Sequence, residues 1–428
     1  MSKYRIAIVG SGGAGLTAAF LLHKKHDVYI YEKENHFGGH AHTLSVVEAD
    51  NKKINLDVGF MVMNSHNYTK FYKLLERLNI VEFGSSEMSF GYSNLTEDIS
   101  YAINWQVNDH FSTQLKMNDG LFDKNNYLND LLPHILKFIH KAKAFLSTSE
   151  QDPISLHDFM EQAKINEKLK KYYIIPIGAA IWSTPFNEML KFPAKNFLQF
   201  FYNHGLLELD RGLAWQHIQG GSRTYVDAIV EKIGNNAKLN AHITSVKRNA
   251  DNVELNFASG EKEKFDKVIL ACHADEALQL LIDPTNQEQA LLSSWSYATN
   301  SAILHCDPSL MPTNKTTWAS WNFISTKSDD SNLCCTYHLN RLQGHTTAQK
   351  DYFLTLNPPY KPADDKIIKQ LLFKHPTYSL AAFKAQDLLK KINGLNNSYF
   401  CGSYLGFGFH EDAVRSGLNV AEDLGCTL

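Results

Sequence analysis

The residues with the clearest chemical meaning stand near the start of the chain. A short apolar run over 4–9 leads into Gly10-Ser11-Gly12-Gly13-Ala14-Gly15. In a Gly-x-Gly-x-x-Gly turn the first glycine permits a tight bend, the second lets the backbone approach a pyrophosphate, and the third lets helix and strand pack closely. A helix expected over 16–24 adds free N–H groups and a partial positive charge. The pattern predicts a dinucleotide site; an ordinary structural turn is the alternative.

An acidic residue follows where a ribose would need it. A second apolar run over 28–31 ends at Glu32, at the tip of the second predicted strand. A carboxylate there can accept hydrogen bonds from a ribose diol, and we place its neighbour Lys33 in the same site. The predicted elements therefore follow the order of a Rossmann unit: a strand, the glycine turn, a helix, a second strand and the acid.

A second glycine pair indicates which dinucleotide is bound. Gly38 and Gly39 come soon after the acid and are followed by His40, His42 and Thr43. NAD-binding units rarely need such a pair. FAD is longer, and its pyrophosphate and ribityl chain need a second place where the backbone can come close. These residues therefore predict FAD, with an ordinary Gly-Gly loop as the alternative.

The remaining cofactor candidates lie in the middle and at the end of the chain. Residues 243–246 and 253–257 predict a hairpin, and 267–273 contains a buried strand. A short strand near 398–401 precedes a helix expected from about 411 to 424, whose N-terminus could stabilise negative charge on a reduced flavin. A capping helix without a ligand is the alternative. The candidates here are Gly59 at the end of a third predicted strand, Val246 as a backbone contact for adenine, and Gly402, Ser403, His410, Glu411 and Asp412.

These segments predict an α/β fold with two discontinuous domains. We expect a Rossmann-like FAD-binding domain built from 1–65, 205–285 and 395–428. The inserts, 66–204 and 286–394, should form an α+β substrate domain, with the flavin ring at the domain boundary. The inserts contain helical patterns near 68–78 and 127–146, and strand patterns near 89–103, 301–305, 318–324, 333–339 and 352–356.

The helical pattern over 127–146 allows two interpretations. Apolar residues repeat at helical spacing, which is typical of a core face. Lys137, Lys141 and Lys143 stand among them. The alternative is a basic amphipathic helix that contacts anionic lipid.

Length and composition exclude several classes of protein. With 428 residues, 44% of them hydrophobic, the chain can bury a large core in two domains or more. A net charge of −3 without clustered Lys and Arg argues against nucleic-acid binding. The six cysteines lack Cys-x-x-Cys spacing and indicate reduced thiols. Without a signal peptide or a run of ~18–20 apolar residues, we expect a soluble, cytoplasmic protein, with peripheral contact to the inner membrane left open.

The cofactor segments resemble those of the FAD-dependent amine oxidase superfamily. That superfamily usually has Arg where this chain has His40, and Glu-Gly-Ala where it has Glu411-Asp412-Ala413. A more specific set of strings spans nearly the whole chain: GGHAHT at 38–43, AIWS at 180–183, NHGLL at 203–207, GGSRTY at 220–225, WASWN at 318–322, YHLNRLQ at 337–343, TLNP at 355–358 and GFGFHED at 406–412. Together they resemble bacterial flavoproteins that are similar to the oxidase-like N-terminal part of plant cyclopropane fatty acid synthases.

The resemblance implies a fold of the amine oxidase or glutathione reductase type and a lipid-linked redox activity. The implied reaction is oxidation of an unsaturated or cyclopropane-modified fatty acyl chain by hydride transfer to flavin N5. Oxidation of a polyamine or monoamine is the alternative within the enzymes. A second alternative is a flavoprotein of low turnover that assembles with a lipid methyltransferase. The oligomeric state stays open.

The catalytic residues leave no motif, because a flavin carries the difficult chemistry itself. Candidates for lining the ring come from predicted strands of the second insert: Trp318, Trp321, Tyr337, Asn340 and Arg341. Core packing is the alternative for each aromatic residue, and a carboxylate partner inside the protein is the alternative for Arg341. Cys401 precedes Gly402 directly and does not match the superfamily's attachment pattern, so we expect non-covalent FAD. We expect no metal site.

Overall fold

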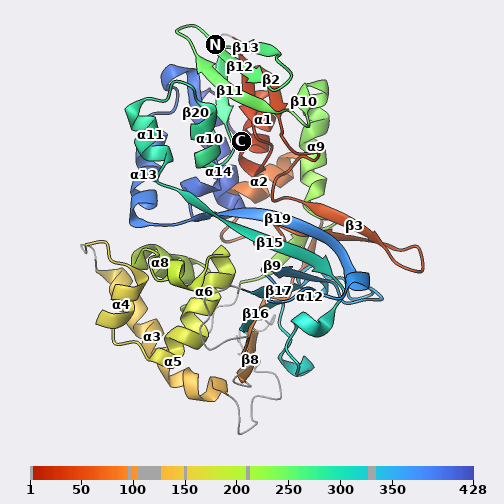
Figure 1. The fold of residues 1–428 in the computed structure, drawn as a ribbon, viewed down its shortest axis with the longest axis vertical. Helices are drawn as coiled ribbons and strands as arrows, with labels where there is room; N and C mark the ends of the chain where they lie inside the picture. The colour runs from red at the N-terminus through yellow and green to blue at the C-terminus, as the bar shows by residue number, and fades with distance from the viewer. Residues whose placement is uncertain (1–2, 95–98, 105–126, 149–151, 209–212, 326–333) are drawn as a thin grey trace.

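The computed structural model describes residues 3–94, 99–104, 127–148, 152–208, 213–325 and 334–428. The chain forms an upper and a lower lobe, and two long strands cross the molecule between them (Figure 1).

A five-stranded sheet forms the centre of the upper lobe. Its order is β10-β2-β1-β14-β20, and every neighbouring pair is parallel. The strands are β1 (Arg5–Val9), β2 (Asp27–Tyr31), β10 (Ala237–Lys238), β14 (Lys267–Leu270) and β20 (Ser398–Phe400). Segments from the start, the middle and the end of the chain therefore meet in one sheet, and their carboxyl ends lie along one edge.

Layers cover both faces of this sheet because the side chains of a strand alternate between faces. Ile6 and Ile8 of β1 pack with one helical layer, while Ala7 and Val9 pack with the other layer. The first layer contains α1 (Gly13–Leu22), α2 (Thr69–Arg77), α9 (Arg223–Ile233) and α14 (His410–Asp423). The second contains α10 (Ala274–Leu280), α11 (Asn286–Leu292), α13 (Leu380–Lys391) and the antiparallel strands β11 (Ile243–Arg248), β12 (Val253–Phe257) and β13 (Lys262–Phe265).

The lower lobe contains a larger, mixed sheet. Its order is β19-β15-β18-β17-β16-β7-β8, antiparallel except between β16 and β7. The strands are β7 (Ser89–Asn94), β8 (Ile99–Asn104), β15 (Ser296–His305), β16 (Trp321–Ser325), β17 (Cys335–His338), β18 (Phe353–Leu356) and β19 (Ile367–Thr377). The helices beside it are α3 (Tyr127–Ser147), α4 (Leu156–Gln162), α5 (Glu167–Leu169), α6 (Ile175–Trp182), α7 (Phe186–Met189) and α8 (Ala194–Asn203).

Two small sheets and a short helix connect the lobes. They are the hairpin of β3 (Thr43–Val47) and β4 (Lys53–Asp57), the sheet of β5 (Met63–Asn64), β9 (Trp215–Ile218) and β6 (Phe83–Ser85), and α12 (Leu339–Leu342).

The structure corrects several sequence-based expectations. The first helix begins at Gly13 instead of 16, because the last three residues of the glycine motif form its first turn. The strand expected over 318–324 begins at Trp321. Arg341 does not lie in a strand, since β17 ends at His338 and α12 follows. The longest strand, β19, and the helices of 156–203 were not predicted at all.

The apolar stripe of α3 is a core face. Leu131, Ile135, Phe138 and Ala142 are all at least 96% buried, and the ammonium group of Lys141 donates to the carbonyl of Ala163. This side of the helix is therefore not available to a lipid surface. Among the described residues, none of the helices combines the length and apolar character needed to cross a bilayer.

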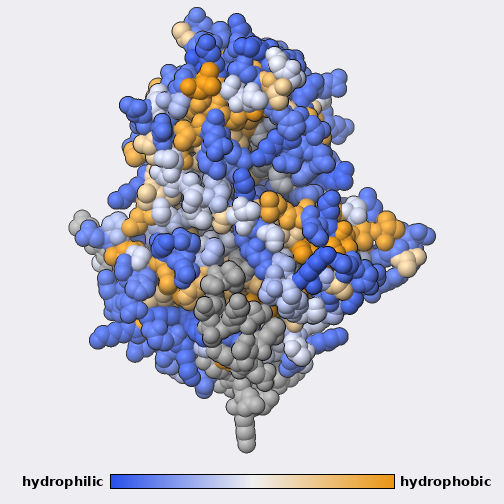
Figure 2. All heavy atoms as spheres, in the orientation of Figure 1, coloured by the Kyte–Doolittle hydropathy of each residue, from blue (hydrophilic) through white to orange (hydrophobic). Residues whose placement is uncertain are grey.

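One edge of the large sheet carries exposed apolar side chains. Within the described part of the chain, β19 pairs with β15 alone and is an edge strand. Figure 2 shows apolar residues gathered at the waist of the molecule. Ile368 and Leu372 of β19 and Val47 of β3 are exposed. Lysines such as Lys369 and Lys374 alternate with them along the strand, which discourages edge-to-edge pairing with another chain.

Candidate active site

The glycine turn after β1 is closed on one side and open on the other. Gly10 has φ +101° and its N–H donates to the carbonyl of Tyr31 at 2.9 Å. A Cβ atom on Gly15 would lie 2.1 Å from the carbonyl oxygen of Gly10, so helix and strand could not pack as they do. A Cβ atom on Gly12 would meet nothing within 4 Å. The free space lies beside the first N–H groups of α1, which have no partner within the helix.

The second glycine pair faces this open space. Gly38 and Gly39 have φ +108° and +57°, and a Cβ atom on Gly39 would lie 3.3 Å from the Cα atom of Gly12. The N–H of Gly38 donates to the carbonyl of Ser11 at 3.1 Å. The two glycine loops thus meet at bare backbone, as a cradle for a pyrophosphate requires.

Glu32 is buried against the glycine turn. Its carboxylate accepts the N–H of Ser11 at 2.9 Å, the hydroxyl of Ser11 at 2.6 Å and the N–H of Glu34 at 3.0 Å. It therefore fixes the loop as well as presenting charge where the ribose is expected. Lys33 turns toward α10 instead, where its ammonium group lies 2.7 Å from the carboxylate of Glu276.

We expect Glu32→Ala to weaken FAD binding by roughly 10- to 150-fold, because a hydrogen bond to a charged group contributes about 1.5–3 kcal/mol. Ser11→Ala is the matched control: it removes the 2.6 Å bond to Glu32 but leaves the carboxylate in place, so its effect should be smaller. Titration of the apoprotein with FAD measures both. Equal affinities of wild type and Glu32→Ala would show that Glu32 does not contact the ribose.

Thr43 and Gly59 belong to the junction between β3, β4 and α9. The hydroxyl of Thr43 donates to the carboxylate of Asp57 at 2.6 Å and accepts the N–H of Arg223 at 2.9 Å. A Cβ atom on Gly59 would lie 2.1 Å from the carbonyl oxygen of His40. Ser222, at the start of α9, donates its N–H to both oxygens of Asp57 at 3.0 Å.

The two acids at the start of α14 are bound to backbone N–H groups. The Glu411 carboxylate accepts the N–H groups of Lys70 and Phe71, each at 2.9 Å, and so caps α2. The Asp412 carboxylate accepts the N–H groups of Phe407 and Phe409 at 2.9 and 3.0 Å. Both side chains are therefore engaged in holding the segments around the start of α14.

The other C-terminal and central candidates are also held in place. The N–H of Gly402 donates to the hydroxyl of Ser416 at 2.9 Å, and the carbonyl of Ser403 accepts the N–H of Gly408 at 3.1 Å. The carbonyl of Val246 accepts the N–H of Ile282 at 3.2 Å, so this acceptor is already engaged without adenine.

Histidines surround the second glycine loop and are kept neutral by burial. Burial lowers the pKa of His42 to about 4 and that of His410 to about 3. It lowers the pKa of His40 well below the ordinary value, and nearby His375 adds to this effect. A Cβ atom on Gly13 would lie 2.9 Å from the ring of His410, which places that ring beside the cradle. Among the described residues, no three His, Cys, Asp or Glu side chains meet as a metal site would require.

Several buried polar atoms around the cradle have no partner within the protein. They are His40 Nε2, His410 Nε2, His273 Nδ1, Tyr378 Oη and Tyr404 Oη. Buried polar atoms normally have hydrogen-bond partners. The bare backbone where Gly12 and Gly39 meet, beside the N-terminus of α1, is what fits the pyrophosphate of FAD.

Of the residues expected to line the ring, three have structural partners. The indole N–H of Trp318 donates to the carbonyl of Pro312 at 2.7 Å. Asn340 accepts the N–H of Tyr352 at 2.7 Å. Arg341 pairs with the carboxylate of Glu87 at 2.8 Å. The alternatives of core packing for Trp318 and of a carboxylate partner for Arg341 therefore describe these two positions.

Trp321 and Tyr337 lie together on adjacent strands. Their ring centres are 4.9 Å apart, edge to face, and the indole nitrogen of Trp321 is buried without a protein partner. Burial raises the pKa of the Tyr337 hydroxyl well above its ordinary value, while a hydrogen bond with Ser183 opposes this.

A cavity of about 430 Å³ lies between β4, β9 and the loop after α12. Its lining includes Lys52, Asn55, His217, Gly221 and His345. This lining is polar, so the cavity is not the apolar tunnel that an acyl substrate would need.

Comparison with known proteins assigns the chain to a family. The profile of the flavin containing amine oxidoreductases matches residues 14–425, and the chain belongs to this family. The expected α/β fold and FAD cofactor are thereby confirmed, and the protein is an FAD-dependent oxidoreductase. No curated protein matches it by sequence.

Solved structures share the fold across the full chain. A CLA-producing fatty acid isomerase from P. acnes is 14% identical with a TM-score of 0.67, covering 99% of this chain and 98% of that one. Putrescine oxidase bound to putrescine is 14% identical with a TM-score of 0.66, covering 99% of both chains. Cyclohexylamine oxidase from Brevibacterium oxydans is 13% identical with a TM-score of 0.68, covering 99% of this chain and 100% of that one.

Proposed function

We propose that this FAD-dependent oxidoreductase acts on an unsaturated or cyclopropane-modified fatty acyl chain. The observation that carries the proposal is the set of hydrogen bonds made by the two acids beside the cradle, Glu411 and Asp412. Both oxygens of Glu411 accept backbone N–H groups, and Asp412 binds two N–H groups and the guanidinium of Arg415 at 2.6 Å. Both carboxylates are thus engaged by groups of the protein itself. A neutral substrate suits such a site better than a cation does.

The segment before α14 is packed into an aromatic cluster. Phe200 of α8 stacks on Phe409 with ring centres 4.7 Å apart, and Trp182 of α6 lies 4.7 Å from Phe200. The indole N–H of Trp182 donates to the carbonyl of Phe407 at 3.0 Å. An apolar wall of this kind favours an acyl chain, whose burial contributes roughly 0.8 kcal/mol per methylene.

The protein's part in the reaction is to bind and orient. Bound FAD would accept a hydride equivalent at N5. The glycine loops would hold its pyrophosphate, Glu32 its ribose, and the N-terminus of α14 would face developing negative charge. Neutral histidines and aromatic side chains around the ring would keep water and competing charges away from it.

Amine oxidation is the second candidate. Putrescine oxidase and cyclohexylamine oxidase share this fold over the whole chain, and aromatic faces such as those of Trp321 and Phe409 can also hold a cation.

Anaerobic mixing of the holoprotein with substrate panels tests the proposal. We expect lipids with unsaturated or cyclopropane-modified acyl chains to bleach the flavin absorbance, while polyamines and monoamines leave it unchanged. Saturated lipids of equal length are the control for detergent effects. Rapid reduction by an amine, with none by any acyl lipid, would overturn the proposal. Reduction by neither panel, together with copurification of a lipid methyltransferase, would favour the role of a partner flavoprotein.

A further inference from the structure

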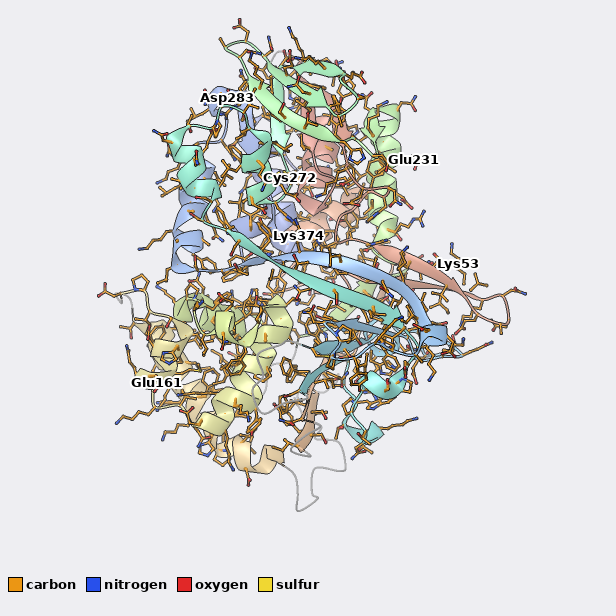
Figure 3. All side chains as sticks on the ribbon, in the orientation of Figure 1. Lys53, Glu161, Glu231, Cys272, Asp283 and Lys374 are labelled. Atoms are coloured by element: carbon orange, nitrogen blue, oxygen red, sulfur yellow. The ribbon has the colours of Figure 1, made fainter. Side chains whose placement is uncertain are left out.

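The large sheet brings a histidine to the cofactor cradle that no sequence motif marks. His375 lies on β19, and its ring centre is 5.2 Å from that of His40. The adjacent Lys374 reaches the carboxylate of Glu276 on α10 at 3.9 Å. In Figure 3, Lys374 lies at the junction of the lobes, below Cys272 of the upper lobe. His375 is therefore held at the boundary where the flavin ring is expected.

A chain of hydrogen bonds fixes which nitrogen of His375 carries the proton. The backbone N–H of Ser301 donates to Asn357 Oδ1 at 3.0 Å, so Asn357 must donate through Nδ2. That group donates to Asn300 Oδ1 at 2.6 Å. Asn300 Nδ2 is consequently a donor, and its two hydrogens serve the two shorter contacts, to His375 Nδ1 at 2.9 Å and the carbonyl of Ser183 at 3.2 Å, while the carbonyl of Ala298 lies at 3.5 Å. Taken alone, the contact between Asn300 Nδ2 and His375 Nδ1 does not show which nitrogen donates. The preceding hydrogen bonds show that Asn300 is the donor.

His375 is therefore a neutral imidazole with its proton on Nε2. Because Nδ1 accepts from Asn300, it cannot carry a proton itself. Burial and the neighbouring His273 lower the pKa of His375 to about 4, so the ring stays neutral near pH 7. The Nε2–H group is then a fixed donor without a net charge.

The neighbours of His375 indicate which group its Nε2–H can reach. The ring is half-buried and faces His40, whose own Nε2 is buried without a protein partner. His40 directly follows the second glycine loop, which contacts Gly12. The two histidines therefore lie next to the glycine loops that would hold FAD.

We propose that His375 donates a hydrogen bond from Nε2 to the polar edge of the flavin ring, with Asn300 as the positioning residue that keeps the proton on that nitrogen. A donor there stabilises the negative charge of the reduced ring and so favours reduction. The proposal requires that the protein binds FAD, as its family does. It does not require that the substrate is an acyl lipid.

Two kinds of variant separate this role from simple packing. Asn300→Asp replaces the donor by a carboxylate of equal size, which accepts a hydrogen bond from His375 Nδ1; as long as the ring stays neutral, Nε2 is then an acceptor. His375→Phe removes the donor, whereas His375→Gln keeps an N–H group. Asn256→Asp, on β12 of the upper lobe, adds the same charge without contacting His375 and is the matched control.

The readout is the equilibrium between oxidised and reduced flavin, measured against a reference dye in variants that contain FAD. We expect Asn300→Asp and His375→Phe to shift this equilibrium about tenfold toward oxidised flavin, which is about 30 mV for two electrons. His375→Gln and Asn256→Asp should stay near wild type. Nitrogen chemical shifts of the His375 ring, assigned by difference from His375→Phe, should place the proton on Nε2.

Two outcomes would overturn the proposal. One is an unchanged equilibrium in His375→Phe with FAD fully bound. The other is a proton on Nδ1 in the wild-type ring, which would contradict the role of Asn300. If Asn300→Asp does not fold, the comparison of His375→Phe with His375→Gln decides, since equal shifts in both would leave no role for the N–H group.

Discussion

Gly12→Val should give a folded protein that contains no FAD. Gly12 has φ −67° and ψ 177°, which any residue can adopt, and its Cβ position is open within 4 Å. The substitution therefore costs the fold little. The branched side chain would fill the space between the glycine loops, where the pyrophosphate must approach. We expect the affinity for FAD to fall more than about 100-fold, or roughly 2.8 kcal/mol.

The measurement is the absorbance of bound flavin after purification and after titration with FAD, together with circular dichroism to follow the fold. Gly15→Ala is the contrasting variant, because its Cβ atom would lie 2.1 Å from the carbonyl of Gly10. It should damage the fold itself. A Gly12→Val protein that retained a full complement of FAD would show that the pyrophosphate does not pass this glycine.

Asp57→Ala should be the most destabilising single change at the junction of the lobes. The carboxylate is 3% exposed and accepts the hydroxyls of Thr43 and Ser222, both at 2.6 Å, as well as the N–H of Ser222. Removing it leaves three buried donors unpaired, at about 1–3 kcal/mol each. We expect the free energy of unfolding to fall by about 3 kcal/mol or more, measured by urea denaturation.

Asp57→Asn is the matched control. Its amide oxygen can still accept the hydroxyls of Thr43 and Ser222, whereas the amide nitrogen at the Oδ2 position cannot accept the N–H of Ser222. Its cost should be clearly smaller than that of alanine. Equal losses of stability in the two variants would show that the packing of the side chain, and not its acceptor oxygens, matters.

Asp57 also predicts a pH dependence of stability. Burial raises its pKa from 3.8 to about 6, although the bonds from Ser222 and Thr43 act in the opposite direction. The folded protein then binds this proton more tightly than the unfolded chain does. Stability should therefore fall as the pH rises from about 4 to about 6, and this contribution should be constant above that range. Asp57→Asn should lack this pH dependence of the free energy of unfolding. Unfolding curves at several pH values would measure the difference.

The sequence could predict the cofactor cradle because its parts are local. The glycine turn, the acid at the end of β2 and the second glycine pair fall within the first 40 residues and have a known order. The roles of the Glu411 and Asp412 side chains could not be read in this way. Glu411 caps α2 through Lys70 and Phe71, which are more than 300 residues away in sequence.

His375 shows a different limit of sequence reasoning. Nothing in its neighbourhood along the chain marks it, since β19 contains Pro376 and was not predicted as a strand. Its orientation depends on Asn300 from β15 and on the carbonyl of Ser183 after α6. Arg341 was placed in a strand because its neighbours are apolar, yet the chain turns into α12 there and reaches Glu87. Such roles follow only from contacts between distant segments.

The assembly of the parallel sheet from distant segments has a consequence for synthesis on the ribosome. The strands β1 and β2 and the helix α1 emerge first, but β20 and α14 follow only after most of the chain. At ~5–20 residues per second this delay is roughly 20–80 s. All ten residues of α1 are buried in the finished protein, so the nascent helix has no polar side to turn toward water. We therefore expect the emerging chain to require a chaperone, and loading of FAD to wait until α14 has docked.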